Sequence, residues 1–217
     1  MQISQKGCRK MNRGEEIIKE LKEHWFKDHK AVLTKHGDLE VLDWRKPGTS
    51  NYAVRYVFDG YRMYISGDIG EAVFYLTWKA HIHSFNGLNI GYFLEKMEAG
   101  EETKWDSEAA EQSLLEWKEE RLQNPEDYFE NKTEEAEFEI LVDNLIDAAN
   151  DCNSTEQWCW QYVHGEYEEE ISRFDDDYWE WMYTIGNVTP YHTYGFLIGL
   201  QMASEQLKES EVERNER

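Results

Sequence analysis

Residues 52–68 read YAVRYVFDGYRMYISGD and place large apolar side chains at every second position on both sides of Asp59-Gly60. A period of two is typical of β-strands, because successive side chains point to opposite faces of a sheet. An Asp-Gly pair between two such runs favours a two-residue hairpin loop. The stretch therefore predicts a β-hairpin, and it decides the fold class of the N-terminal half.

Strand-like patterns also flank this hairpin. Alternation begins at Asp38 and ends at a predicted turn, Lys46-Pro47-Gly48, and residues 72–78 form a further candidate strand. We therefore predict an antiparallel meander of three or four strands. A bare sheet of this size needs a packing partner, and residues 13–35, whose apolar side chains roughly follow the helical period, supply the candidate helix.

Helical spacing replaces alternation after His83. Helices are predicted at residues 88–97, 106–122, 133–150, from Ser154 onward, 175–183 and 189–208. The sequence thus predicts an α+β protein, with residues 1–100 forming a helix-and-sheet subdomain and residues 101–217 an acidic helical subdomain. The two could share one core.

The formal charge of −22 is placed unevenly along the chain. Residues 1–100 hold 15 Lys and Arg against 13 Asp and Glu, whereas residues 101–217 hold 8 against 32, so the two halves carry +2 and −24. Such a field repels nucleic acid and anionic lipid and attracts basic protein surfaces. The alternative is a surface that serves solubility alone, although the charge exceeds what solubility requires.

The remaining composition indicates a folded protein of the cytoplasm. Aromatic residues make up 14% of the chain, which disordered acidic tails lack. No apolar run approaches the roughly 18 residues of a membrane span, and we expect no secretory signal. The three cysteines, Cys8, Cys152 and Cys159, fit reduced thiols better than a disulfide framework.

The predicted helix at 133–150 carries an acidic stripe opposite its apolar face. Glu139, Asp143 and Asp147 recur at i, i+4, a spacing at which like charges destabilise a helix by about 0.2–0.5 kcal/mol per pair. No Lys or Arg lies between Lys132 and Arg173, so a cationic partner would relieve this repulsion. The alternative is a merely solvated helix face.

Two further acidic blocks, residues 166–170 and 175–177, are interleaved with Trp and Tyr. Aromatic anchors beside carboxylates suit a protein interface, although some of these rings must belong to a core. The candidate partner-binding residues are Glu139, Asp143, Asp147, Glu166, Glu168, Glu169, Glu170, Asp175, Asp176, Asp177 and Trp179.

Metal and catalytic patterns are weak. Cys152, Cys159 and His164 offer three soft ligands, but their spacing matches no common zinc pattern and a fourth ligand is missing. His81 and His83 could share one side of a strand. Residues 66–71 contain two glycines but lack the Lys and the glycine order of phosphate-binding loops, so a turn is expected there. We predict no catalytic residue, no metal and no cofactor.

Small residues recur at Gly195, Gly199 and Ala203 in the predicted final helix. Each glycine inside a helix costs about 1 kcal/mol, which implies close packing of this ridge. The ridge either lies in the core, which we favour, or forms the interface of a homo-oligomer.

Three segments, residues 64–74, 92–96 and 195–203, resemble uncharacterised proteins of phages and prophages of Gram-positive bacteria. The resemblance covers about a ninth of the chain. It implies a phage accessory gene product, a group that includes inhibitors of CRISPR nucleases and other bacterial immune systems. It carries over no functional residues.

We therefore expect a non-enzymatic counter-defence protein that binds a basic, nucleic-acid-binding surface of a host immune nuclease in the bacterial cytoplasm. One alternative is a protein that binds a nucleotide signal on its aromatic sheet, where the cations Arg45, Arg55, Arg62 and Lys79 are few. The other is a metal-dependent enzyme that uses the scattered His and acidic residues.

Overall fold

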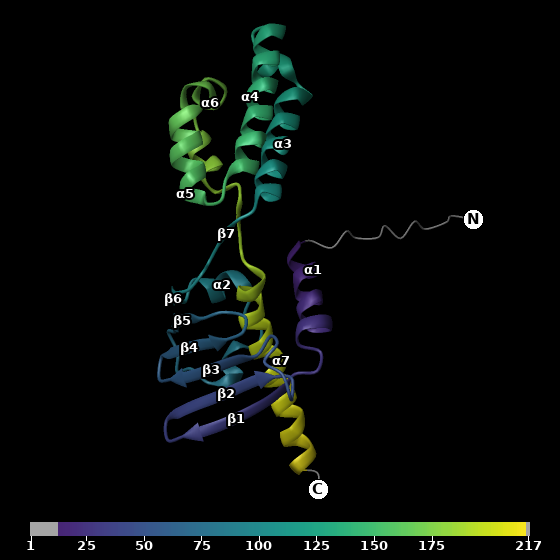
Figure 1. Ribbon diagram of the computed structural model, residues 1–217, viewed down its shortest axis with the longest axis vertical. Coiled ribbons are helices and arrows are strands. Elements are labelled where there is room, and N and C mark those ends of the chain that lie inside the picture. Colours follow the sequence, from purple (N-terminus) through teal and green to yellow (C-terminus); the bar gives the residue numbers. More distant parts are fainter. Residues whose placement is uncertain (1–12, 216–217) are drawn as a thin grey trace, which may run out of the picture. The chain divides into compact units, whose positions relative to one another are not determined.

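The computed structural model describes residues 13–215, with the side chains of residues 13–213 (Figure 1). The chain forms two compact units. The first, here the sheet unit, comprises the residues up to Glu102 and those from Pro190 onward. The second, the acidic unit, comprises Thr103–Thr189.

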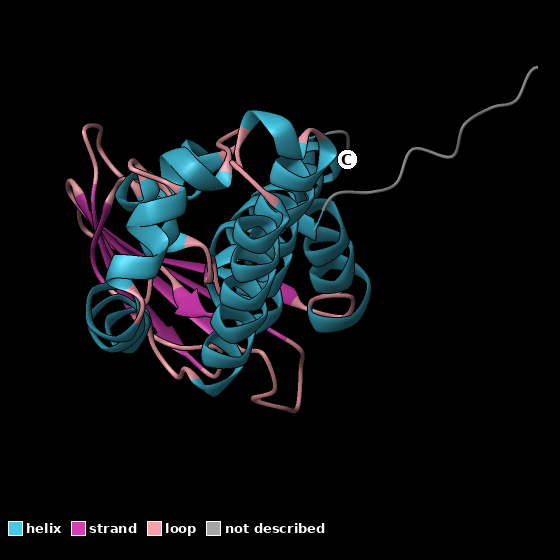
Figure 2. Cartoon of the chain, turned by 90° about the horizontal axis from the view of Figure 1, so that it is seen from above, coloured by secondary structure: helices cyan, strands magenta, loops and turns pink. Residues whose placement is uncertain are grey.

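The sheet unit is built on one antiparallel sheet of six strands in the order β1-β2-β3-β4-β5-β6. The sheet is larger than the predicted three or four strands, and Figure 2 shows its strands (magenta) gathered in one layer. The strands are β1 (Lys30–His36), β2 (Leu39–Arg45), β3 (Val54–Asp59), β4 (Arg62–Gly67), β5 (Ala72–Tyr75) and β6 (Met97–Ala99).

The predicted hairpin is confirmed as β3 and β4, but its two-residue loop is Gly60-Tyr61 and not Asp59-Gly60, because Asp59 pairs with Arg62. Gly60 has a φ of 60°, a conformation that glycine adopts without steric cost. The alternation on these strands is that of a half-covered sheet: Val54, Tyr56 and Phe58 are buried, whereas the residues between them are at least partly accessible.

The predicted helix over residues 13–35 is wrong in its second half. Helix α1 covers Arg13–Glu20, a π-helical turn follows at Leu21–Trp25, and the chain then enters β1. Gly37, with a φ of 63°, reverses the chain so that His36 pairs with Leu39. From spacing alone, the helix could continue through Val32, Leu33 and Thr34. Two of these residues are β-branched and the segment pairs with β2, and both features favour a strand.

A second boundary also differs from the prediction. The expected helix at 88–97 is a short helix, α2 (Ile90–Leu94), followed by the edge strand β6. Asn89 caps α2 by accepting a hydrogen bond from the backbone N–H of Tyr92. The expected strand at 72–78 ends at Tyr75.

Helix α7 (Tyr191–Asn215) belongs to the sheet unit. The sequence instead predicts this segment to be part of the acidic C-terminal subdomain. Figure 1 shows α7 and α1 running beside the sheet. A Cβ atom at Gly195 would lie 3.0 Å from Cδ1 of Ile69, and one at Gly199 would lie 2.6 Å from the hydroxyl oxygen of Tyr56. The small-residue ridge is therefore core, as favoured from the sequence.

The acidic unit is helical. Its main elements are β7 (Lys104–Trp105), α3 (Ser107–Gln123), η3 (Pro125–Asp127), α4 (Lys132–Asp151), α5 (Thr155–Gln157), the π-helix η4 (Trp158–Glu166), α6 (Glu168–Phe174), the 3₁₀ turns η5 (Tyr178–Glu180) and η6 (Met182–Thr184), and β8 (Asn187–Val188). Strands β7 and β8 pair with each other, so the two ends of the unit lie side by side.

The N-caps of these helices follow the sequence closely. Asp106 caps α3 and Ser154 caps α5, at the predicted starts of these helices, whereas α4 is capped by Asn131 and begins one residue earlier than expected. The predicted helix at 175–183 is replaced by η5 and η6. The core of the unit is rich in aromatic rings, including Trp117, Phe138 and Trp158. In the described part of the chain, no helix combines the length and the hydrophobicity needed to cross a bilayer.

Candidate protein-binding site

The acidic stripe on α4 lies opposite the buried side of that helix. Phe138, Leu141, Val142, Leu145 and Ala149 are buried, as the spacing predicts. The repulsion along the stripe is relieved from outside the segment. Lys118 on α3 places its ammonium nitrogen 2.7 Å from Oδ1 of Asp143 and 3.8 Å from Oε2 of Glu139.

Asp147, by contrast, is exposed and has no cation near it in the ion pairs of the described residues. Side chains of Asp143 and Glu139 remain 67% and 46% accessible despite the pairing. The stripe is therefore partly neutralised but still faces solvent.

The block at 166–170 lies where one helix ends and the next begins. Glu166 is the last residue of η4, and Glu168, Glu169 and Glu170 form the first turn of α6. Carboxylates in a first turn are stabilised by the helix dipole by about 0.3–1 kcal/mol each. These carboxylates therefore stabilise the start of α6, whether or not they also bind a partner.

The block at 175–177 divides into two kinds of side chain. Asp175 is turned inward: its side chain is 14% exposed, one carboxylate oxygen lies 3.5 Å from Nη2 of Arg121, and the same oxygen accepts a hydrogen bond from Nε1 of Trp181 at 3.2 Å. Asp176 and Asp177 are exposed. Asp175 therefore organises the fold of the unit, and its two neighbours are free to face a partner.

Two Trp side chains of the acidic unit face solvent. Trp160 is 73% exposed and Trp179 is 52% exposed. The indole of Trp160 stacks on His164, with ring centroids 5.2 Å apart, and His164 lies 3.7 Å from Glu168. Exposed Trp is costly in water and is enriched among the residues that anchor protein interfaces.

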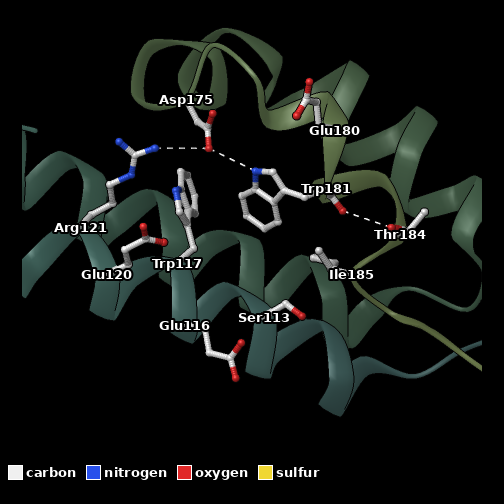
Figure 3. Close-up of a pocket in the computed structure, with 10 residues that line it drawn as sticks. All are labelled: Ser113, Glu116, Trp117, Glu120, Arg121, Asp175, Glu180, Trp181, Thr184 and Ile185. Atoms are coloured by element: carbon white, nitrogen blue, oxygen red, sulfur yellow. Dashed lines mark hydrogen bonds and ion pairs between the residues drawn. The ribbon is translucent and has the colours of Figure 1, made fainter.

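A cavity of about 600 Å³ lies between α3 and the segment from Asp175 to Ile185 (Figure 3). It is lined by Ser113, Glu116, Trp117, Glu120, Arg121, Asp175, Glu180, Trp181, Thr184 and Ile185. The rings of Trp117 and Trp181 are 5.4 Å apart and inclined by 59°. The cavity is thus aromatic in its interior and carboxylate-rich at its margins.

The sequence did not point to this cavity. Trp117, Arg121 and Glu120 lie in α3, whereas Glu180 and Trp181 lie about 60 residues later and reach the cavity only through the fold. A weak signal was present, since Trp117 and Arg121 are four residues apart on one helix face.

The three candidate soft ligands, Cys152, Cys159 and His164, are not arranged to coordinate a metal ion. Cys152 is buried, Cys159 donates its thiol to the backbone oxygen of Tyr183 at 3.4 Å, and His164 stacks on Trp160. Burial raises the pKa of the Cys152 thiol to about 11. Among the described residues, no group of three or more His, Cys, Asp or Glu side chains is arranged to hold a metal ion.

His81 and His83 lie at a 3₁₀ turn and not on a strand. His81 caps the turn by accepting a hydrogen bond from the backbone N–H of His83. The Nδ1 atom of His83 lies 2.7 Å from the hydroxyl oxygen of Ser204 on α7. Both imidazoles therefore take part in local packing.

Two of the four candidate cations on the sheet, Arg55 and Arg62, are paired with carboxylates. Arg55 forms a two-pronged contact with Asp43 at 2.8 and 3.2 Å, and Arg62 lies 2.9 Å from Glu98. In the turn at 66–71, the carboxylate of Asp68 accepts a hydrogen bond of 2.7 Å from the backbone N–H of Tyr52. A nucleotide on this face would have to compete with these pairs.

Comparison of the chain with protein-family models, with curated proteins and with solved structures finds no match in any of the three. The expected relationship to phage accessory proteins therefore stays a prediction.

Proposed function

We propose that the acidic unit binds a basic surface of another protein, a surface that otherwise holds nucleic acid. The observation that supports this most directly is the exposure of Trp160 and Trp179 within a strongly acidic unit. Residues 103–189 contain 5 Lys and Arg against 25 Asp and Glu, a formal charge of −20. The indoles would supply buried contact area and the carboxylates would supply complementarity to Lys and Arg.

The density of charge indicates how much of the surface is needed. Duplex DNA carries one charge per about 1.7 Å of its axis. Acids at i, i+4 on a helix recur every 6 Å or so, because the rise is about 1.5 Å per residue. The α4 stripe alone is therefore too sparse to imitate DNA, so the proposal also requires Asp176, Asp177 and the block at 166–170 to contact the partner.

The protein would act without chemistry, by occupying the partner's nucleic-acid groove. The resemblance to phage proteins would make it a counter-defence inhibitor, with an immune nuclease of a CRISPR or another system as its partner in the host cytoplasm. Direct binding of nucleic acid is not part of this role, since the field repels phosphates.

The test begins with affinity purification of partners from a bacterial lysate at low and high salt, followed by mass spectrometry. The recombinant partner is then titrated with the full-length protein in competition with labelled DNA. The diagnostic variant reverses five acids to Lys: Glu139, Asp143, Asp147, Asp176 and Asp177. Asp175 is left unchanged because it is paired inside the unit. Binding should weaken at least a hundredfold, and the wild-type affinity should fall steeply with salt.

A matched control reverses five exposed acids of the sheet unit, Glu71, Glu95, Glu102, Glu205 and Glu209, which changes the total charge by the same amount. This control should retain most of the affinity. An equal loss of affinity in both variants would mean that binding depends only on the total charge of the protein. Unchanged affinity in the five-site variant of the acidic unit would remove the proposed function.

A further inference from the structure

The indole nitrogen of Trp117 is a buried donor without an acceptor. Trp117 is 5% exposed, and its Nε1 atom finds no hydrogen-bond partner among the residues that the structure describes. Leaving such a group unpaired destabilises the folded protein, because the donor loses its hydrogen bond to water and gains none in return. A ligand that offers an acceptor to this nitrogen would recover that free energy.

The other enclosed indoles of the acidic unit are satisfied. Trp105 donates to the backbone oxygen of Ala149 at 3.2 Å, Trp158 to that of Met182 at 2.8 Å, and Trp181 to Asp175 at 3.2 Å. Trp117 differs from these three, and it is also the one that lines the cavity together with Trp181. Figure 3 shows its nitrogen on the ring edge that faces Glu120 and Arg121.

The margins of the cavity favour a cation. Glu116 and Glu120 line the cavity from α3, and Glu180 lines it from the opposite side (Figure 3). All three residues are exposed at the opening. Arg121 is the only cation among the described lining residues, and Asp175 already pairs with it. A ligand in this cavity therefore meets a surplus of negative charge.

The interior suits the stem of a basic side chain. Trp117 and Trp181 present rings inclined by 59°, and a guanidinium or ammonium group within about 6 Å of a Trp face gains cation–π attraction. The volume of about 600 Å³ lies within the roughly 300–1,000 Å³ of ligand-binding pockets. Acceptor, cation and apolar stem together describe a short segment of peptide with a basic residue.

We propose that this cavity is a docking pocket for an arginine- or lysine-bearing peptide segment of the partner, whose backbone carbonyl accepts the N–H of Trp117 while its basic side chain lies between Glu116, Glu120 and Glu180. Because the nitrogen is covered in the structure, this contact requires the side chains of Glu120 and Arg121 to move aside. This inference rests on the proposed function for the sign of the partner's charge, but it concerns different residues.

The test uses full-length protein labelled with ¹⁵N at its tryptophan indoles and titrated with N-acetyl-Arg-Arg-Arg-amide. The uncharged control is the same peptide with citrulline at each position, which keeps the carbonyls and the shape of the side chains. The Trp117→Phe variant identifies the resonance of Trp117. That resonance should shift saturably with the arginine peptide, and the citrulline peptide should leave it in place.

Two triple variants that remove equal charge locate the site. Glu116→Gln/Glu120→Gln/Glu180→Gln should weaken the peptide at least tenfold. The matched variant Glu166→Gln/Glu169→Gln/Glu170→Gln changes exposed acids outside the cavity and should alter its dissociation constant less than threefold. Trp117→Phe should weaken the peptide about three- to tenfold by removal of the donor.

A Trp117 resonance that stays in place when other resonances shift to saturation would overturn the inference, and so would equal losses in the two triple variants. Either result leaves the proposed function standing if the five-site reversal still abolishes binding of a basic partner. Conversely, the peptide could bind in the cavity while the five-site variant keeps its affinity for the basic partner. That result would remove the proposed function but support the docking pocket.

Discussion

The hydroxyl group of Tyr56 on β3 donates a hydrogen bond of 3.0 Å to the backbone oxygen of Phe196 on α7, across 140 residues of sequence. Tyr56 is fully buried, and burial raises its pKa well above the ordinary value, so it donates as the neutral phenol. The bond fixes how closely α7 approaches the sheet. The missing side chain at Gly199 makes this approach possible.

The pair Tyr56 and Gly199 should therefore behave as a coupled unit. Gly199→Ala should lower the free energy of unfolding by about 1–3 kcal/mol, because its Cβ would lie 2.6 Å from the Tyr56 oxygen. Tyr56→Phe should cost about 0.5–1.5 kcal/mol, the net value of one hydrogen bond, because it removes the donor to the Phe196 carbonyl. The double variant should lose less than the sum, since Phe removes the clashing oxygen.

Urea unfolding of the four proteins in this cycle measures the coupling. Gly91→Ala is the control, because a Cβ there meets no atom closer than Asn89 Oδ1 at 3.5 Å, and this helical glycine should tolerate Ala without loss. Strict additivity in the cycle would contradict the close contact.

Acid should destabilise the sheet unit through His29. This residue is 3% exposed, and its Nε2 lies 3.1 Å from the backbone oxygen of Tyr52. Burial lowers the pKa of His29 below 6.5, so the unfolded chain takes up its proton first as the pH falls. Its contribution is thus complete above about pH 6.5 and is lost as the pH falls toward the folded-state pKa.

The measurement is urea unfolding between pH 7.5 and 5.5, above the range where carboxylates titrate. His29→Gln keeps a donor for Tyr52 but does not titrate, so its stability should depend less on pH than that of the wild type. His83, whose pKa burial also lowers, contributes a remaining slope. Identical slopes in wild type and variant would exclude His29 as the cause.

The thiols of the acidic unit should react slowly in the folded protein. Burial raises the pKa of Cys152 to about 11 and also raises that of Cys159, so little thiolate forms at pH 8. In a Cys8→Ser background, which removes the cysteine outside the described residues, a disulfide reagent should label both thiols slowly in buffer and fully in urea. The native rate should keep rising to pH 10 without a plateau near 9, and rapid native labelling at pH 8 would refute this.

Lys118 should stabilise the acidic unit by relieving the α4 stripe. Lys118→Gln should lower the free energy of unfolding by up to about 1 kcal/mol, the range of partly exposed pairs. Salt at 0.5 M should recover part of the loss, because it screens the repulsion between Glu139 and Asp143. Lys132→Gln, which removes an 83% exposed cation from the same unit, is the matched control and should cost less. Equal costs would indicate that Lys118 acts only through net charge.

The hairpin, the helix starts and the buried side of α4 could be predicted from the sequence, because they depend on residues that are close together in the chain. The hairpin at Asp59–Arg62, the caps Asp106 and Ser154, and the buried side of α4 all follow from spacing and from short-range hydrogen bonds. Residues 30–36 were misread for the same reason: their spacing fits a helix as well as a strand, and only pairing with β2 selects the strand. Strand β6 is too short to give a periodic signal.

The sequence by itself determined the concentration of negative charge and the close packing of Gly195 and Gly199, since charge and the lack of a side chain need no folding to be known. Only the tertiary structure decided where these features act. It places α7 on the sheet, brings Lys118 to the acidic stripe, turns Asp175 inward and leaves Trp160 exposed. These outcomes depend on contacts between residues far apart in the chain, and such contacts leave no period in the sequence.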